Sequence, residues 1–391
     1  MHSLEDLNIE GKRVLVREDF NVPIQDGRIT DDTRLKAGIP TLEYIVDHGG
    51  AAIVLSHFGR PVEGEFEDQY SLEPVANALS QLMGRPVRFE PNWLDGLPIQ
   101  NGEIVLCENV RFQVGEKAND DELSKRMASL GDIFVNDAFA TAHRAQASTH
   151  GIAKFAKIAC AGPLLKAEID ALSQALSEPK RPLVAIVGGS KVSTKLDVLE
   201  SLTQKVDQLI VGGGIANTFL LADNKSVGNS LCEPDMTEIA LRLIESSAAS
   251  GANIPIPKDV VCGKAFDAAT PAETKSADAI AEDDMVMDLG PETLKEIEQI
   301  LTDAGTIVWN GPLGVFEFGQ FSAGTQRLAR AIANSGAFSI AGGGDTLAAI
   351  SKFNVSEKIS YISTGGGAFL EFLEGKILPA VEILESRAAD T

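Results

Sequence analysis

The segment Ile340-Ala341-Gly342-Gly343-Gly344-Asp345-Thr346 joins a short apolar run to three glycines, an acid and a hydroxyl, and helix-forming residues follow it. This order predicts a buried strand, a tight turn and the start of a helix. Backbone N–H groups at a helix start attract an anion, and glycines let a ligand approach the main chain. For one isolated copy, a plain turn with Asp345 as the helix cap is an equally good interpretation.

The pattern is not isolated. Apolar runs also precede glycines at Gly188-Gly189, Gly212–Gly214 and Gly365–Gly367. A turn can be made with a single glycine, asparagine or aspartate, so repeated glycines indicate close approach of a ligand or of another backbone. We therefore predict that the second half of the chain contains an anion-binding edge.

The first half alternates apolar strands with amphipathic helices. Strands that are apolar on both faces and alternate with helices predict a parallel sheet that is covered on both sides, which is an α/β fold. The predicted strands are Val14–Val16, Ala52–Leu55, Glu103–Leu106 and Ile133–Val135, and the predicted helices are Thr33–Asp47, Leu72–Met83 and Asp121–Leu130.

Polar and basic residues follow each of these strands. The carboxyl ends of parallel strands share one edge, where ligands bind. A single arginine is usually a solvated surface group, but the repetition in an acidic protein predicts a convergent site for carboxylate or phosphate. The residues after the four strands are, in order, Arg17, Asp19, Asn21 and Arg34; His57 and Arg60; Arg111; and His143 and Arg144.

Composition limits the class of protein. The 391 residues are 44% hydrophobic and 23% charged, with a formal net charge of −22, which argues against nucleic-acid and anionic-membrane partners. The four cysteines are too far apart to predict a zinc site or disulfides. The N-terminus lacks the features of a secretory signal, and no apolar run is long enough to span a membrane. We expect a soluble cytoplasmic protein with two or three domains.

Two lysines stand out after Gly188-Gly189. Lys191 and Lys195 are four residues apart, so on a predicted helix they would share one face. They would also lie in its first turns, where the helix dipole disfavours cations. A phosphate between both ammonium groups and the helix start resolves this conflict; two exposed lysines without a role are the alternative.

Motif comparison narrows the chemistry. The P-loop and protein-kinase motifs are absent, and the dinucleotide fingerprint is incomplete because Asn217 replaces its last glycine. Asp345, among phosphate-binding glycines, is suited to Mg²⁺, which takes one or two carboxylates plus phosphate oxygens. No general base is evident, and phosphoryl transfer to or from a carboxylate needs none because that nucleophile is already ionised.

Three further segments organise the chain. Leu165–Leu176 is predicted to be an amphipathic helix that ends before Pro179 and Pro182, and we place a domain boundary there. Pro255–Cys262 is predicted to be an edge or entry strand, and Leu378–Arg387 to be a short helix.

Together these motifs resemble phosphoglycerate kinases from end to end. The segments that carry the resemblance are Val14–Pro23, Ser56–Pro61, Glu108–Phe112, His143–Ser148, Gly188–Lys195, Trp309–Glu317, Gly342–Thr346 and Ser363–Gly367. The departures are mild: Glu18 replaces a small or apolar residue, Ser190 replaces alanine, and Ile215-Ala216-Asn217 replaces Met-Ala-Tyr.

The resemblance implies reversible phosphoryl transfer from MgATP to the carboxylate of 3-phosphoglycerate, which gives 1,3-bisphosphoglycerate and ADP. It implies a monomer of two Rossmann-like three-layer αβα domains with mainly parallel sheets. These would be residues 1–165, which bind 3-phosphoglycerate, and residues 183–374, which bind the nucleotide. Residues 166–182 would form the connecting helix and hinge, and a helix in residues 375–391 would pack back on the first domain.

The resemblance also implies roles for individual residues. Arg34, Lys191 and Lys195 would be catalytic, and Asp345 would be the magnesium ligand. The residues expected to bind 3-phosphoglycerate are Asp19, Asn21, Arg34, His57, Arg60, Arg111 and Arg144. The residues expected to bind the nucleotide are Lys195, Gly212, Gly213, Asn310, Pro312, Glu317, Gly343, Gly344, Asp345 and Thr346. The alternatives are a nicotinamide-dependent dehydrogenase and a non-catalytic phosphometabolite-binding protein of similar fold.

Overall fold

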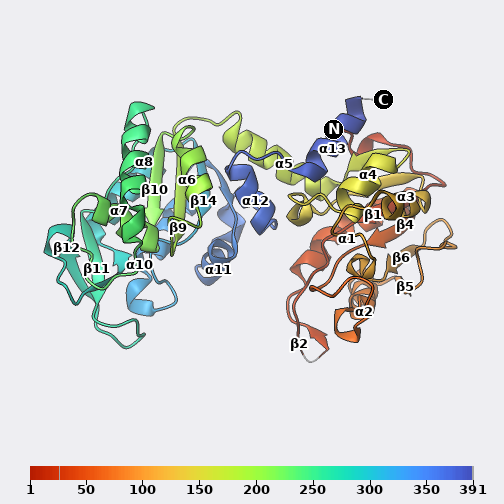
Figure 1. The fold of residues 1–391 in the computed structure, drawn as a ribbon, viewed down its shortest axis with the longest axis horizontal. Helices are drawn as coiled ribbons and strands as arrows, with labels where there is room; N and C mark the ends of the chain where they lie inside the picture. The colour runs from red at the N-terminus through yellow and green to blue at the C-terminus, as the bar shows by residue number, and fades with distance from the viewer. Residues whose placement is uncertain (26, 390–391) are drawn as a thin grey trace. The chain divides into compact units, whose positions relative to one another are not determined.

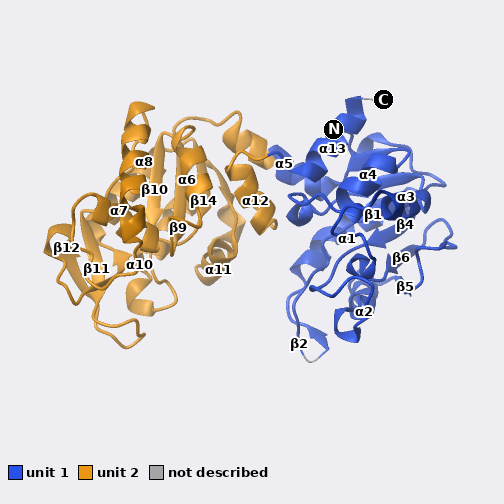
Figure 2. Ribbon diagram, in the orientation of Figure 1, with its two compact units in different colours: residues 1–170, 377–391 blue, residues 171–376 orange. Residues whose placement is uncertain are grey.

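The computed structural model describes residues 1–25 and 27–389. These residues form two compact units, each with its own core (Figure 2). Unit 1 comprises the described residues of Met1–Asp170 and Ile377–Thr391, and unit 2 comprises Ala171–Lys376. The boundary between the units falls within helix α5 (Pro163–Leu176), before the prolines at which the sequence placed it and inside the 166–182 segment that the resemblance implies for the connection.

Unit 1 is built on a parallel sheet with the strand order β5-β6-β4-β1-β7-β8. The strands are β1 (Arg13–Arg17), β4 (Ala51–Leu55), β5 (Arg88–Glu90), β6 (Ile104–Cys107), β7 (Ile133–Asn136) and β8 (Ala159–Ala161). Strands β2 (Ile24–Gln25) and β3 (Arg28–Ile29) form a separate antiparallel pair. Every residue of β4 and β6 is buried, as expected for strands covered on both faces. The register places Arg17 of β1 beside Leu55 of β4 and Asn136 of β7, so the carboxyl ends of these strands are level.

The helices of unit 1 come from both ends of the chain. Besides α5 they are α1 (Thr33–Asp47), α2 (Glu73–Met83), α3 (Asp121–Ser129), α4 (Ile152–Phe155) and α13 (Pro379–Ala389). The C-terminal helix α13 packs against α4 and β8 (Figure 1). The Ala380 N–H donates to the Ala142 carbonyl at 3.1 Å, and Arg387 Nη2 donates to the Ala156 carbonyl at 2.9 Å.

Unit 2 also contains a parallel sheet, with the strand order β10-β9-β14-β15-β16. Figure 1 labels its strands β10, β9 and β14. Its strands are β9 (Leu183–Gly189), β10 (Gln208–Gly212), β14 (Thr306–Asn310), β15 (Phe338–Ala341) and β16 (Tyr361–Ile362). The helices are α6 (Leu196–Thr203), α7 (Gly213–Ala222), α8 (Thr237–Ala249), α9 (Pro291–Asp303), α10 (Ala323–Asn334), α11 (Gly344–Lys352) and α12 (Gly366–Leu373). A core around Trp309, Ile307 and Leu328 packs between this sheet and helices α9, α10 and α11.

A small antiparallel sheet completes unit 2, and it corrects one prediction. Its strand order is β12 (Glu273–Ser276), β11 (Asp259–Gly263), β13 (Met285–Leu289). The segment Pro255–Cys262 was predicted to be an edge or entry strand, but β11 is the central strand of this sheet and pairs on both sides. Pro255 and Pro257 precede the strand, so they withhold no N–H group from its ladders.

The predicted alternation of strands and helices is confirmed, and the fold class is α/β with parallel sheets. Within residues 1–25 and 27–389, no helix has both the length and the apolar character needed to cross a membrane.

Candidate active site

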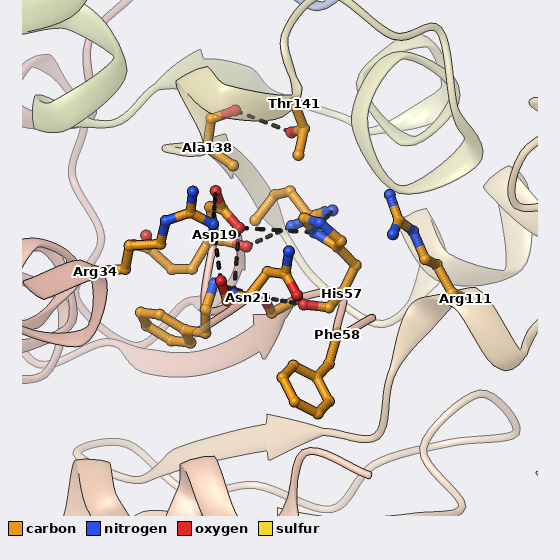
Figure 3. Close-up of polar contacts among 12 residues, drawn as sticks. Asp19, Asn21, Arg34, His57, Phe58, Arg111, Ala138 and Thr141 are labelled. Carbon is orange, nitrogen blue, oxygen red and sulfur yellow. Dashed lines mark hydrogen bonds and ion pairs between the residues drawn. The ribbon is translucent and has the colours of Figure 1, made fainter. Parts of the chain in front are cut away.

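The polar residues predicted after the strands of unit 1 gather at the carboxyl edge of its sheet (Figure 3). Arg34 Nη1 lies 3.0 Å from Asp19 Oδ2 and donates to the Asn21 carbonyl at 2.8 Å. The Gly59 N–H donates to Asn21 Oδ1 at 3.0 Å, and His57 Nδ1 lies 3.8 Å from Asp19 Oδ1. The loop after β1, the start of α1 and the loop after β4 are therefore joined by side chains of the predicted site.

Arg17 belongs to the same cluster. The sequence placed it among the residues that converge after the strands but gave it no individual binding role. It is fully buried at the end of β1. Its Nε donates to Ser148 Oγ at 3.0 Å, and Ser148 in turn donates to Glu116 Oε1 at 2.6 Å. The sequence signal was a cation that ends a strand whose other buried positions are apolar.

Arg17 also determines the tautomer and the protonation state of His57. Its Nη2 lies 3.2 Å from His57 Nδ1, and because a guanidinium only donates, Nδ1 must be the acceptor. The ring proton is then on Nε2. Burial, followed by the charges of Arg17 and Arg111, holds the pKa of His57 well below its ordinary value of 6.5. His57 is therefore a neutral N–H donor at physiological pH.

The remaining cations of the cluster repel one another. Burial, followed by the charges of Arg17 and Arg144, lowers the pKa of Arg111 to about 10. The Arg111 guanidinium donates to the Gly59 carbonyl, Arg144 Nε lies 3.0 Å from His143 Nε2, and Arg60 is exposed. Buried like charges favour an anion that neutralises them, so this edge is suited to phosphate or carboxylate.

In unit 2, the glycine turns lie in a row along the carboxyl edge of the parallel sheet, but they serve two purposes. A Cβ on Gly188 or Gly212 would lie 1.9 or 2.4 Å from the Pro312 carbonyl oxygen. These two glycines therefore admit another backbone. At Gly344 and Gly366, a Cβ would meet no described atom within 4 Å apart from chain neighbours, so space for a ligand exists there. Gly343 has φ +98°, a conformation that favours glycine.

Lys195 points back to this edge and corrects a second prediction. Helix α6 begins at Leu196, so Lys191 and Lys195 do not share a helical face. Lys191 lies exposed in the preceding turn, and Lys195 is the N-cap residue. The Ser193 hydroxyl donates to Glu233 at 2.6 Å and the Thr194 hydroxyl to the Lys191 carbonyl at 2.9 Å. The Thr194 bond is local and favours a turn over a helix, and the Ser193 bond ties this turn to a residue 40 positions away.

The Lys195 ammonium is held between two strand ends. Its Nζ donates to the Gly188 carbonyl and to Asn310 Oδ1, both at 2.6 Å. Burial lowers its pKa to about 8, and the charge of Asp345 opposes that effect. Lys195 and Asp345 are thus within electrostatic reach of each other at this edge.

The predicted adenosine-end residues lie on a loop that we call the nucleotide loop, Asn310–Glu317. Asn310 Nδ2 donates to the Gly342 carbonyl, and the Gly311 N–H donates to Thr346 Oγ1, each at 2.8 Å. Pro312 is partly buried and Glu317 is exposed. Thr346 is buried and bonds to the loop, so its hydroxyl has a role in the fold that the sequence did not reveal.

The donor set at Asp345 fits magnesium bound through a nucleotide. Asp345 is exposed in the first turn of α11, beside the open position of Gly344. Among the described residues, no group of three or more His, Cys, Asp or Glu side chains is arranged to hold a metal ion. One carboxylate plus phosphate oxygens and water is the usual arrangement for Mg²⁺.

These features define an α/β phosphotransferase: one unit presents clustered cations, and the other presents glycine turns, a lysine and a carboxylate. A model of the family "Phosphoglycerate kinase" matches residues 4–376. Phosphoglycerate kinases of Francisella tularensis subsp. holarctica (strain LVS) and subsp. novicida (strain U112) are each 58% identical over 386 residues, which is 99% of this chain and 98% of theirs. The chain belongs to the phosphoglycerate kinase family.

Solved structures agree with this assignment. Phosphoglycerate kinase from Coxiella burnetii superposes with a TM-score of 0.97 at 53% identity, covering 99% of each chain. The enzyme from Pyrococcus horikoshii OT3 gives a TM-score of 0.82 at 31% identity, covering 100% of each chain. The activity is reversible phosphoryl transfer between ATP and the carboxylate of 3-phosphoglycerate, a reaction of glycolysis. The comparisons do not favour the dehydrogenase or the non-catalytic alternative.

Proposed function

We propose that 3-phosphoglycerate binds at the cationic edge of unit 1. The observation that carries this assignment is the mutual repulsion of the buried cations around His57, which an anionic ligand relieves. Arg34 also reaches the transferring phosphoryl group, and neutral His57 donates from Nε2. The residues assigned to the ligand are Asp19, Asn21, Arg34, His57, Arg60, Arg111 and Arg144, with Arg17 behind them.

Unit 2 is the proposed nucleotide site. The open positions at Gly344 and Gly366 leave room for phosphates at the starts of α11 and α12, where backbone N–H groups favour anions. Gly343 supplies the turn, and Gly212 and Gly213 shape the start of α7. Asn310, Pro312 and Glu317 line the adenosine end, and Thr346 holds the nucleotide loop. Asp345 would hold Mg²⁺, which supplies charge neutralisation on the phosphates.

The chemical step needs positioning and charge stabilisation rather than a base. The acceptor carboxylate is ionised at neutral pH, so no proton has to be removed before it attacks. Lys195, whose ammonium already lies at the edge, stabilises negative charge on the transferring group together with Lys191. We further propose that the protein acts as a cytoplasmic monomer.

A coupled phosphoryl-transfer assay with ATP and 3-phosphoglycerate tests this assignment. Lys195→Ala should lower kcat by roughly 10²-fold, as the loss of one electrostatic donor does elsewhere. Lys295→Ala, at an exposed position of α9, is the matched control and should leave kcat unchanged. Near-normal turnover of Lys195→Ala would disprove the role given to Lys195. Titration with NADH in parallel with MgADP tests the dehydrogenase alternative, which requires the NADH complex to form.

A further inference from the structure

The backbone of the nucleotide loop is hydrogen-bonded to strand β13 and helix α10 of unit 2. The Val315 N–H donates to the Met287 carbonyl of β13 at 2.7 Å. The N–H groups of Leu313 and Gly314 donate to Thr325 Oγ1 of α10 at 3.1 and 3.4 Å. Because the loop lacks regular secondary structure, its position depends on such bonds, together with the bond of Gly311 to Thr346 described above.

Asp288 on β13 is buried at the point where these elements meet. Its side chain is 1% exposed. Oδ2 accepts the Gly324 N–H at the start of α10 at 2.7 Å, and Oδ1 accepts the Leu289 N–H at 2.9 Å. A Cβ on Gly314 or on Gly324 would lie only 2.3 or 2.1 Å from Oδ1. The carboxylate therefore fills the space between the nucleotide loop and the start of α10.

Burying a carboxylate costs desolvation free energy, so packing alone does not explain the presence of Asp288 at this position. Burial raises the pKa of Asp288 to about 7, and the hydrogen bonds from Gly324 and Leu289 oppose that rise. A neutral residue of similar volume would avoid the desolvation of a charged group. What it could not do is offer two accepting oxygens, one to the Gly324 N–H at the start of α10 and one to the Leu289 N–H of β13, in the space left by Gly314 and Gly324.

We propose that Asp288 and Thr325 are positioning residues for the nucleotide. They hold the loop backbone at Leu313 and Gly314, and through it they place Pro312 and Glu317. Both residues are buried, so the proposed role acts through the loop and not through contact with the reacting atoms. The inference rests on the proposed function, because it takes the nucleotide loop to be the adenosine end of the ATP site.

The chain offers a matched control for the helix-capping part of this role. Asp259 lies on the neighbouring strand β11 and is also buried. Its carboxylate accepts the N–H groups of Glu292 and Thr293 at the start of α9, at 3.0 and 2.8 Å. Asp259 thus caps a helix as Asp288 does, but it serves α9 rather than the nucleotide loop.

The experiment compares Asp288→Asn with Asp259→Asn, and Thr325→Val with Thr325→Ser, in the full-length protein. Calorimetric titration with MgADP, the separate KM values for ATP and 3-phosphoglycerate, and thermal unfolding are measured for each. Asp288→Asn replaces one of two accepting oxygens, and Thr325→Val removes the acceptor of the Leu313 and Gly314 N–H groups. Each variant should weaken MgADP binding and raise the KM for ATP by about tenfold, which corresponds to the free energy of roughly one buried hydrogen bond. The KM for 3-phosphoglycerate should stay within about twofold of the wild-type value, a difference under 0.5 kcal/mol.

The controls separate positioning from stability. Asp259→Asn should lower Tm without weakening MgADP binding, and Thr325→Ser, which keeps the hydroxyl acceptor, should restore most of the affinity lost in Thr325→Val. Normal MgADP binding in a folded Asp288→Asn protein, or equal weakening in Asp259→Asn, would overturn the inference. If Asp288→Asn does not fold, the Thr325 pair decides the matter. Failure of the wild-type protein to bind MgADP would instead overturn the proposed function.

Discussion

At the residue scale, the protonation state of Lys195 is coupled to the binding of an anion. Its ammonium bonds to the Gly188 carbonyl and to Asn310, yet burial lowers its pKa to about 8. In the unliganded protein, part of the Lys195 population is therefore neutral in mildly alkaline solution. A nearby phosphate favours the charged form, so ligand binding should raise this pKa again.

Binding of MgADP should consequently be coupled to proton uptake. With a free pKa of about 8, complete protonation at pH 8 takes up roughly half a proton per site, and affinity should fall as the pH rises through 8. Calorimetric titrations in buffers of different ionisation enthalpy measure this number. Lys195→Arg is the control, since a guanidinium stays protonated throughout. The same uptake in Lys195→Arg and in the wild-type protein would refute the assignment to Lys195.

At the scale of elements, the glycine turns separate backbone packing from ligand space. Gly188→Ala would place a methyl group against the Pro312 carbonyl at 1.9 Å, whereas Gly344→Ala would meet no described atom within 4 Å beyond its neighbours. Gly188→Ala should lower Tm by several degrees and weaken MgADP binding, because strand and loop must move apart (about 1–3 kcal/mol for overpacking). Gly344→Ala should leave Tm within about a degree of the wild-type value but should still weaken MgADP binding.

Thermal unfolding and MgADP titration of both variants test the packing role assigned to Gly188 and the ligand-space role assigned to Gly344. An unchanged Tm for Gly188→Ala would show that the loop is not tightly packed against β9. Full nucleotide affinity of Gly344→Ala would show that no ligand approaches the start of α11.

The elements also show what the sequence could and could not reveal. The alternation of bulky apolar strands with helices was recognisable from the sequence. Because parallel strands end at one edge, the sequence also predicted that Arg34, His57 and Arg111 lie near one another, as the structure shows. Strand β8 was missed because Ala159–Ala161 lacks the β-branched residues typical of strands. The turn before α6, the central place of β11 and the burial of Arg17 depend on contacts between distant segments, which local patterns do not encode.

At the scale of the whole molecule, the negative net charge of the protein opposes the binding of its anionic ligands. The protein carries a formal net charge of −22, while both proposed ligands are anions. The cations of unit 1 and Lys195 of unit 2 must therefore provide the attraction locally, over distances shorter than the Debye length of about 8 Å at physiological salt. Binding energy should then be concentrated near the two sheet edges.

Amide hydrogen exchange measured with each ligand alone tests whether the binding energy is localised at the two sheet edges. The units have separate cores, so a ligand should slow amide exchange mainly in the unit that binds it. We expect 3-phosphoglycerate to protect the segments after β1, β4, β6 and β7, and MgADP to protect those after β9, β14 and β15. Lys195→Ala should lose the second pattern and keep the first. Protection by 3-phosphoglycerate that appeared mainly within residues 183–374 would contradict the assignment of the two ligands to the two units.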